Sequence, residues 1–301
     1  MRAVVTGGAG FIGSHLVDAL AARGDEAHVV DNFATGRREN LNGAAVLHEH
    51  DIREPLDDLF AEIRPERVFH LAAQADVGTS VEKPLFDAEV NVLGTLRVLE
   101  AARAQDARVV FSSTGGAIYG ECPEPAREDA VREPLAPYGT SKLCGEEYLA
   151  TWNRLHGTRH TSLRFGNVYG PRQLAKLEGG VVAIFMDRLR AGEQATIFGD
   201  GEQARDFVFV GDVVRALLAA ADANAVGTFN VGTGRATSVN ELWRLCADTA
   251  GGGGEPDHGD PRPGDLRRSV LDVSRAREAL GWEPRTPLDQ GLRETWESGA
   301  A

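Results

Sequence analysis

Short apolar runs alternate with amphipathic segments along the first half of the chain. The apolar runs predict strands near Ala3–Thr6, His28–Asp31, Val46–His50, Arg67–Ala72, Arg108–Ser112 and His160–Arg164. Between them, apolar positions recur at the spacing of one helical face and predict helices at Phe11–Arg23, Pro84–Ala104 and Tyr138–His156. This alternation is typical of repeated βαβ units, and it therefore predicts an α/β fold with a doubly wound parallel sheet.

The regular alternation of strand-like and helical segments ends after Phe165, where loops lengthen and glycine and proline become more frequent. Helices are expected at Val181–Arg190, Asp212–Ala221, Val239–Thr249 and Ser274–Leu280. The glycines at 251–254 predict a flexible loop. We therefore expect a nucleotide-binding domain over residues 1–165 and a smaller C-terminal α/β substrate-binding domain over residues 166–301, with some segments interleaved.

Composition narrows the possible partners and the cell compartment. The formal net charge of −13 opposes binding to nucleic acid or to anionic lipid. No apolar run approaches the ~20 residues of a membrane helix, and the first residues lead into a strand without a signal peptide, so we expect a cytoplasmic protein. Cys122, Cys144 and Cys246 are odd in number and widely spaced, which predicts neither a disulfide framework nor a metal site.

A glycine-rich turn links the first strand to the first helix. Gly7, Gly10 and Gly13 allow a tight turn, close approach of backbone to a pyrophosphate, and close packing of helix on strand. The helix N-terminus adds free N–H groups and a partial positive charge. Asp31 ends the second strand 24 positions after Gly7, where a carboxylate binds ribose hydroxyls and repels a 2′-phosphate. The pattern predicts a Rossmann fold that binds NAD rather than NADP.

Two further pairs of residues bear on this cofactor prediction. Arg37 and Arg38 would favour NADP, but they lie beyond the strand, whereas Asp31 holds the discriminating position. Asp51 follows the third strand, where its carboxylate could bind the adenine amino group while Ile52 packs on the ring. Asp51 taken alone is equally well explained as a surface or capping residue.

Candidate chemistry lies at the start of the helix expected over residues 138–156. Tyr138 and Lys142 are four residues apart, so both side chains lie on one face. Because an ammonium stabilises a phenolate, we expect Lys142 to lower the pKa of Tyr138 from ~10 toward neutrality and make it a usable base. Ser113 and Thr114 follow the fifth strand, at the sheet edge where doubly wound folds bind ligands, and either hydroxyl could bind the same sugar oxygen.

These motifs belong to a longer series that runs in order along nearly the whole chain. The series is GGAGFIG, DNFATGRREN, HLAAQADV, VEKP followed by NVLGT, SSTGGAIYG, YGTSK, RFGNVYGPRQ, GDGEQARDFVFVGD and RPGD. With it the chain resembles the extended short-chain dehydrogenases/reductases of the NAD-dependent epimerase/dehydratase family, and most closely the UDP-glucose 4-epimerase group. The resemblance implies an isomerase that carries tightly bound NAD and inverts C4 of a UDP-sugar through a transient 4-keto intermediate.

The resemblance also assigns roles around the strand–helix motif. Tyr138 would take the hydroxyl proton, Lys142 would hold the nicotinamide ribose and tune Tyr138, and Thr114 would assist. Ser113 remains a rival of Thr114, because the strand end carries one extra glycine. Further cofactor contacts implied by the resemblance are Phe11, Ile12, Asn32, Thr35, Gly36, Leu71, Ala72, Ala73, Gln74, Asn91 and Ser112.

A second group of residues is implied to hold the nucleotide sugar. Asn167 and the guanidinium groups of Arg205 and Arg262 would bind the diphosphate, a match that suits the bidentate geometry of arginine. Asp265 would bind the nucleotide ribose. Asp206 is expected to be structural, as a strand-edge partner of Arg205.

Ser269 lies four residues after Asp265, where the family often places a residue that gates the sugar pocket. Because serine is small, it predicts that UDP-GlcNAc and UDP-GalNAc enter as well as UDP-glucose and UDP-galactose. The resemblance further implies a homodimer, in which the helices expected at Pro84–Ala104 and Tyr138–His156 pair across a two-fold axis.

The sequence also bears on other functions of the same scaffold. A sugar-nucleotide dehydratase needs an Asp-Glu pair after the strand-end threonine, where this chain has Gly115 and Gly116. A UDP-uronic acid epimerase or decarboxylase stays open. A non-catalytic NAD-binding regulator is disfavoured because Tyr138 and Lys142 are both present. His70 and His15 are expected to be structural.

Overall fold

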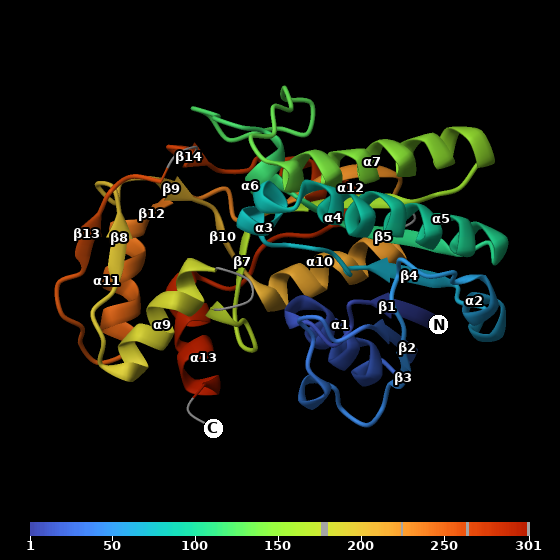
Figure 1. The fold of residues 1–301 in the computed structure, drawn as a ribbon, viewed down its shortest axis with the longest axis horizontal. Coiled ribbons are helices and arrows are strands. Elements are labelled where there is room, and N and C mark those ends of the chain that lie inside the picture. The colour runs from blue at the N-terminus through green and yellow to red at the C-terminus, as the bar shows by residue number, and fades with distance from the viewer. Residues whose placement is uncertain (176–179, 224, 263–264, 300–301) are drawn as a thin grey trace.

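The computed structural model describes residues 1–175, 180–223, 225–262 and 265–299. Its centre is a seven-stranded parallel sheet in the order β11-β6-β5-β4-β1-β2-β3 (Figure 1). Its strands are β1 Arg2–Thr6, β2 Glu26–Asp31, β3 Val46–Glu49, β4 Arg67–His70, β5 Arg108–Thr114, β6 Thr161–Phe165 and β11 Gly227–Val231. The order runs outward in both directions from β1, which confirms the predicted doubly wound sheet and creates a crevice beside β1.

Helices cover both faces of this sheet. Val4 and Val5 of β1 show why, because successive side chains of a strand point to opposite faces and each of these valines is buried in a different apolar cluster. One face is covered by α1 Phe11–Ala22, α10 Val210–Asp222 and α12 Ser274–Leu280. The other face is covered by α2 Asp57–Ile63, α5 Thr95–Ala104 and α7 Pro137–His156.

The last strand of the sheet was not predicted from the sequence. β11 pairs with β6 from Gly227↔Thr161 to Val231↔Phe165, and α10, from the same half of the chain, packs beside α1. Segments of the C-terminal half therefore complete the sheet of the N-terminal half. The division into residues 1–165 and 166–301, with interleaved segments, stays a prediction about domains.

The helix predicted at Pro84–Ala104 is interrupted. It consists of α4 Pro84–Ala88, a π-helical turn η2 Glu89–Gly94 and α5. A π turn widens the helix locally and re-aims its side chains; here it carries the buried Asn91 toward the sheet edge. Short helical elements that were not predicted include α2, α3 Val77–Glu82, α6 Gly115–Ile118 and the 3₁₀ turn η1 Arg38–Asn40.

The remaining elements form a smaller lobe beside the sheet (Figure 1). Its helices α9 Val181–Ala191, α11 Val239–Thr249 and α13 Leu288–Ser298 share a third apolar cluster. Its strands are β7 Asn167–Tyr169, β8 Thr196–Phe198, β9 Ala204–Arg205, β10 Phe207–Phe209, β12 Thr237–Ser238, β13 Asp257–Gly259 and β14 Arg268–Ser269. Pro263 and Gly264 of the RPGD motif lie outside the described residues. Across the described ranges, every helix is too short or too polar to span a membrane.

Candidate active site

A cleft of about 940 Å³ opens between the carboxyl ends of the central strands and the smaller lobe. Of the residues predicted for the cofactor, the lining includes Gly7, Gly10, Phe11, Ile12, Gly13, Asp31, Asn32, Thr35, Asp51, Ile52, Leu71, Ala72, Ala73, Gln74, Ser112, Tyr138 and Lys142. Of the other predicted site residues, it includes Ser113, Asn167, Arg205, Arg262 and Asp265. Gly36, Asn91, Thr114 and Ser269 are not among the lining residues. The fold thus gathers most of both predicted sets around one cavity.

The glycine turn has the geometry that a dinucleotide diphosphate requires. Gly7 has a positive φ of 70°, and a Cβ there would lie 2.7 Å from the backbone nitrogen of Ala72. A Cβ at Gly13 would lie 2.1 Å from the carbonyl oxygen of Gly7, so α1 approaches β1 only with glycine. A Cβ at Gly10 would meet only the Gly7 carbonyl oxygen within 4 Å, which leaves this residue open for close approach of a phosphate at the start of α1.

Asp31 is held rigidly at the end of β2. Its carboxylate accepts hydrogen bonds from the backbone N–H groups of Ala9 at 2.9 Å and Phe33 at 2.8 Å. A Cβ at Gly36 would lie 2.9 Å from both carboxylate oxygens, which explains why this neighbour is glycine. Burial raises the pKa of Asp31 above its ordinary value. A fixed carboxylate here suits ribose hydroxyls and opposes a 2′-phosphate.

The residues near the predicted adenine site are also held by hydrogen bonds and ion pairs. Asp51 accepts from Asn32 Nδ2 at 2.8 Å and from the guanidinium of Arg53, which holds the pKa of Asp51 well below its usual range. Arg38 is engaged with Glu49 and lies over the ring of Phe33. Arg38 is therefore already engaged with other side chains of the protein, consistent with NAD.

Asn91 acts from behind the cleft wall. It accepts from the Gln74 backbone N–H and donates to the Gln74 carbonyl oxygen, both at 2.9 Å. It also donates to Asp87 at 3.0 Å and to Ser141 at 3.2 Å. The π turn thus places Asn91 to hold the segment after β4 that forms the cleft rim.

Tyr138 and Lys142 meet the end of β5, as their helical spacing predicts. Tyr138 hydrogen-bonds the side chain of Thr114. Lys142 donates from Nζ to the carbonyl oxygen of Ser112 at 3.0 Å. Both α7 side chains therefore converge on the strand end beside the crevice.

The predicted lowering of the Tyr138 pKa is wrong for this structure. Burial, followed by the charge of Asp87, raises the pKa of Tyr138 to about 12, and the hydrogen bond from Thr114 offsets only part of this. Burial also lowers the pKa of Lys142 to about 8, with Asp87 and Glu146 opposing that shift. The prediction considered only the ammonium and neglected the cost of burying a phenolate.

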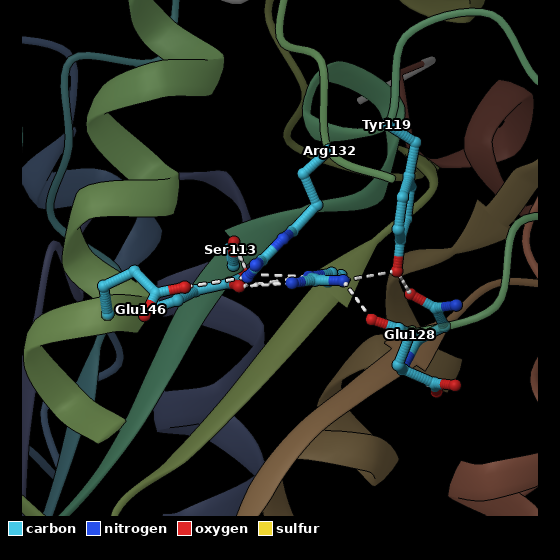
Figure 2. Close-up of polar contacts among 8 residues, drawn as sticks. Ser113, Tyr119, Glu128, Arg132 and Glu146 are labelled. Atoms are coloured by element: carbon cyan, nitrogen blue, oxygen red, sulfur yellow. Dashed lines mark hydrogen bonds and ion pairs between the residues drawn. The ribbon is translucent and has the colours of Figure 1, made fainter. Parts of the chain in front are cut away.

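Ser113 is engaged by a residue that was not predicted for the site. Its hydroxyl donates to Glu146 on α7, and Figure 2 shows the two side chains directed toward each other. Glu146 and Asp87 were missed in the sequence. The spacing contained one signal, because Glu146 lies on the helical face of Tyr138 and Lys142, eight and four residues earlier.

Both histidines have the structural contacts expected of them. His70 lies between the hydroxyls of Thr6 at 2.8 Å and Thr95 at 3.0 Å. Burial lowers its pKa to about 3. His15 contacts the carbonyl oxygen of Pro171 at 2.9 Å.

The substrate end of the cleft is less completely bonded. Asn167 has a buried Nδ2 for which the described residues supply no hydrogen-bond acceptor. Arg205 pairs with Asp265, and the guanidinium of Arg262 lies 4.0 Å from the ring centroid of Phe198. An unpartnered amide donor and guanidinium groups in one cavity suit an anionic ligand such as a diphosphate.

Asp206 is structural, but its predicted partner is wrong. Its buried carboxylate accepts from Thr233 at 2.7 and 2.6 Å and from the backbone of Gly234 at 3.0 Å, rather than from Arg205. Asp206 follows the last residue of β9, and successive residues of an extended chain point to opposite sides, so its side chain is directed away from that of Arg205. Ser269, on β14, lies opposite Arg205 in the ladder and is buried.

Comparison with known proteins bears directly on this arrangement. Residues 3–232 match the NAD dependent epimerase/dehydratase family. A UDP-glucose 4-epimerase of Mycolicibacterium smegmatis is 47% identical over 99% of this chain and 98% of that protein. The crystal structure of a Thermotoga maritima UDP-glucose 4-epimerase with UDP-glucose is 48% identical, with a TM-score of 0.98 over 100% of this chain and 99% of that one. The Thermus thermophilus UDP-glucose 4-epimerase complex with NAD is 45% identical, with a TM-score of 0.95 over 100% and 99%.

These similarities extend over the glycine turn, the strand–helix motif and the substrate end of the cleft alike. They confirm the fold class and the NAD cofactor that the sequence predicts, and the glycine turn and Asp31 fit that cofactor. The chain therefore belongs to the NAD dependent epimerase/dehydratase family.

Proposed function

We propose that this protein interconverts UDP-glucose and UDP-galactose by inverting C4 of the sugar. The observation that carries the proposal is one cleft lined at one end by Tyr138 and Lys142, with Lys142 fixed on the end of β5, and at the other end by Arg205, Arg262 and Asp265. A base at one end and anion-binding groups at the other suit a nucleotide sugar. The relatives that bind UDP-glucose and NAD support this assignment.

The protein's side chains divide the work as follows. Thr114 orients the C4 hydroxyl, and Tyr138 takes its proton and later returns it. Lys142, fixed on the Ser112 carbonyl oxygen, holds its amine at the strand end where Tyr138 acts. NAD, when bound, supplies the reversible acceptance of a hydride from C4. Asn167, Arg205 and Arg262 hold the diphosphate while the 4-keto sugar rotates in the pocket between the two hydride transfers.

The test uses purified protein with UDP-galactose and no added NAD. We expect UDP-glucose to form, and Tyr138→Phe to slow the conversion by about 10²–10⁴-fold while NAD stays bound. Separation of the nucleotide sugars by anion-exchange chromatography measures both. If wild-type protein carries NAD but converts no UDP-sugar, a non-catalytic NAD-binding regulator becomes the better description.

The dehydratase alternative meets a steric obstacle. A Cβ at Gly115 would lie 2.6 Å from a methyl carbon of Leu271, so an acidic side chain there would require repacking. Incubation with UDP-glucuronic acid, alongside UDP-galactose, tests the uronic acid epimerase and decarboxylase. Product mass separates them, because only decarboxylation removes carbon dioxide.

The sugar pocket is proposed to admit acetylated sugars because Ser269 is small. We expect turnover of both UDP-GlcNAc and UDP-glucose by wild-type protein, and selective loss of the acetylated sugar in Ser269→Tyr. Rejection of UDP-GlcNAc by wild-type protein, unchanged by the substitution, contradicts this role.

A homodimer is proposed from the apolar surface of α3, α4, η2 and α7. Val81, Leu85, Leu93 and Leu155 are exposed there to 61%, 80%, 51% and 68%. Such side chains are typical of a surface that a partner covers. Light scattering of the purified protein measures the mass, and Leu85→Glu is expected to shift it to that of one chain. The cytoplasmic location stays a prediction.

A further inference from the structure

Helix α7 contacts the end of β5 through a third side chain, beyond the two that serve the proposed reaction. Tyr138, Lys142 and Glu146 follow one another at intervals of four residues and lie on one helical face. Tyr138 and Lys142 meet the residues on either side of Ser113. Glu146 meets Ser113 itself, accepting from its Oγ at 2.5 Å. Three side chains, each about one helical turn from the next, thus contact the three residues at the strand end.

Glu146 is fixed in this position by Arg164 of the neighbouring strand β6. Arg164 donates from Nε at 2.9 Å and from Nη2 at 2.6 Å to the two carboxylate oxygens. The Glu146 side chain is 4% exposed and the Arg164 side chain is 2% exposed. Arg164 is also the ladder partner of Ser113, so the carboxylate bridges helix and two strands. The bidentate contact prevents rotation of the carboxylate.

The contacts continue beyond Arg164 to the other side of the sheet edge (Figure 2). Arg164 donates from Nη1 to the Tyr119 hydroxyl at 2.6 Å and to the Glu128 carbonyl oxygen at 3.2 Å. Tyr119 donates to Asn230 Oδ1 on β11 at 2.7 Å. The orientation of Glu146 is therefore secured from β11 and from the loop that contains Glu128.

Stability alone is a weak reason for such an ion pair. Two buried charges lose their hydration, and well-packed apolar side chains of similar volume often stabilise a fold as well or better. What a bidentate pair provides is a defined geometry. Here that geometry lies one helical turn from Lys142 and directly beside the residue that Tyr138 contacts.

We propose that Glu146 is a positioning residue for the epimerisation: held by Arg164, it engages the Ser113 hydroxyl and sets the register of α7 on β5 so that Tyr138 meets Thr114. The inference rests on the proposed function. It also favours Thr114 over Ser113 as the residue that assists Tyr138, because the Ser113 hydroxyl already donates to Glu146.

The charge of Glu146 adds a second measurable consequence. Lys142 is surrounded by Tyr138 and Glu146 on its own helix, Asp87 on α4 and His70 on β4. Both carboxylates favour its ammonium form, while burial lowers its pKa to about 8. Removing the charge of Glu146 takes away one of these two carboxylates, so the Lys142 pKa falls further.

The decisive variant is Glu146→Gln, which keeps size and one acceptor but removes the charge. Its matched control is Glu147→Gln, because Glu147 is 56% exposed and pairs with Arg132 in a loop. We expect kcat of Glu146→Gln to fall by on the order of 10- to 100-fold, with KM changed less than about twofold. The alkaline limb of its kcat–pH profile should move to lower pH, whereas Glu147→Gln should match wild type in all three.

Wild-type epimerisation is measured first, so failure of the proposed function is seen separately. Bound NAD and circular dichroism report whether each variant is folded. A folded Glu146→Gln enzyme with wild-type kcat and pH profile overturns the inference. The inference is also overturned if Glu146→Gln lowers kcat without moving the pH profile while Glu146→Ala keeps wild-type kcat.

Should Glu146→Gln fail to fold, Ser113→Ala decides the question, because it removes only one hydroxyl from the network. We expect kcat to fall about threefold to tenfold, at unchanged KM. An unchanged kcat overturns the inference. Where both variants fold, Ser113→Ala should have little further effect in the Glu146→Gln protein, since the two act as one unit. Independent, multiplying effects would place Ser113 on the substrate directly and contradict the positioning role.

Discussion

The two ends of the cleft differ in how their polar groups are satisfied. At the cofactor end they are bonded within the protein before any ligand arrives. Asp31 accepts from two backbone amides, and Asn91 makes hydrogen bonds to Gln74 from both ends of its amide. At the substrate end, Asn167 has a buried Nδ2 with no acceptor among the described residues, and Arg205 is neutralised by Asp265.

This difference matches what the proposed reaction asks of each end. NAD is regenerated within each cycle, so a prearranged site that holds it tightly costs nothing in turnover. A nucleotide sugar must enter and leave each time. Side chains that exchange one partner for another, or that gain a partner only when the ligand binds, can bind the nucleotide sugar and still release the product quickly. The geometry of the cofactor end is therefore fixed by the backbone and by side chains bonded to it, whereas the substrate end depends on side chains that can change partners.

The largest effect is expected from a change to the backbone-defined end. Gly13→Ala places a Cβ 2.1 Å from the Gly7 carbonyl oxygen and must displace α1 from the turn. Because the turn has to bring backbone close to the pyrophosphate, we expect less than about a tenth of the wild-type NAD and a similar or greater loss of activity. NAD released by heat is measured by its absorbance and by enzymatic cycling.

The control for this change is Gly43→Ala, since a Cβ at Gly43 meets no atom within 4 Å. This variant should retain wild-type NAD and activity. If Gly13→Ala retains NAD as Gly43→Ala does, the turn adapts and the cofactor end is not defined by its backbone.

A smaller effect, confined to KM, is expected at the side-chain-defined end. Arg262→Ala removes a guanidinium that lines the cleft. Losing charge-assisted hydrogen bonds to a phosphate costs roughly 1.5–3 kcal/mol, so KM for the UDP-sugar should rise about 10- to 100-fold with NAD content unchanged. Arg267→Ala is the control, because Arg267 is exposed and pairs with Asp200. A loss of NAD in Arg262→Ala would break the separation of the two ends.

The same contrast explains which parts of the site could be read from the sequence. Gly7, Gly13 and Asp31 are recognisable because a tight turn beside a strand admits few residue types. The i, i+4 spacing likewise places Tyr138 and Lys142 on one face without knowledge of the fold. Local geometry is sufficient for these predictions, and the parallel sheet follows from repeated local patterns in the same way.

What could not be read depends on contacts between distant segments. The strand β11 is recognisable only once β6 offers an edge for it, and the partner of Asp206 comes from residues 27 and 28 positions later. The raised pKa of Tyr138 follows from burial by several elements together. Glu146 carried a spacing signal, but its importance rests on Arg164, which a different strand supplies.

The smallest effect, and the sharpest form of the comparison, lies in two asparagines changed in the same way. Asn91→Ala leaves the backbone N–H and C=O of Gln74 without their partner and removes one of the two donors to Asp87, so the free energy of unfolding should fall by about 2 kcal/mol or more. Asn167→Ala removes an Nδ2 that has no acceptor in the described part of the protein, and it should change that free energy by less than about 0.5 kcal/mol. Urea unfolding at saturating NAD measures both.

The KM values of the two variants should then differ in the opposite direction from their stabilities, with the larger change in Asn167→Ala. Asn167→Ala removes a cleft-lining donor that we propose binds the diphosphate, so KM for the UDP-sugar should rise about fivefold to tenfold in a protein of wild-type stability. Asn91→Ala, corrected for its fraction folded and loaded with NAD, should keep a KM close to wild type, because Asn91 lies behind the wall and acts on the rim through Gln74. If Asn167→Ala instead lost as much stability as Asn91→Ala, Asn167 would be satisfied within the fold, and the substrate end would be prearranged in the same manner as the cofactor end.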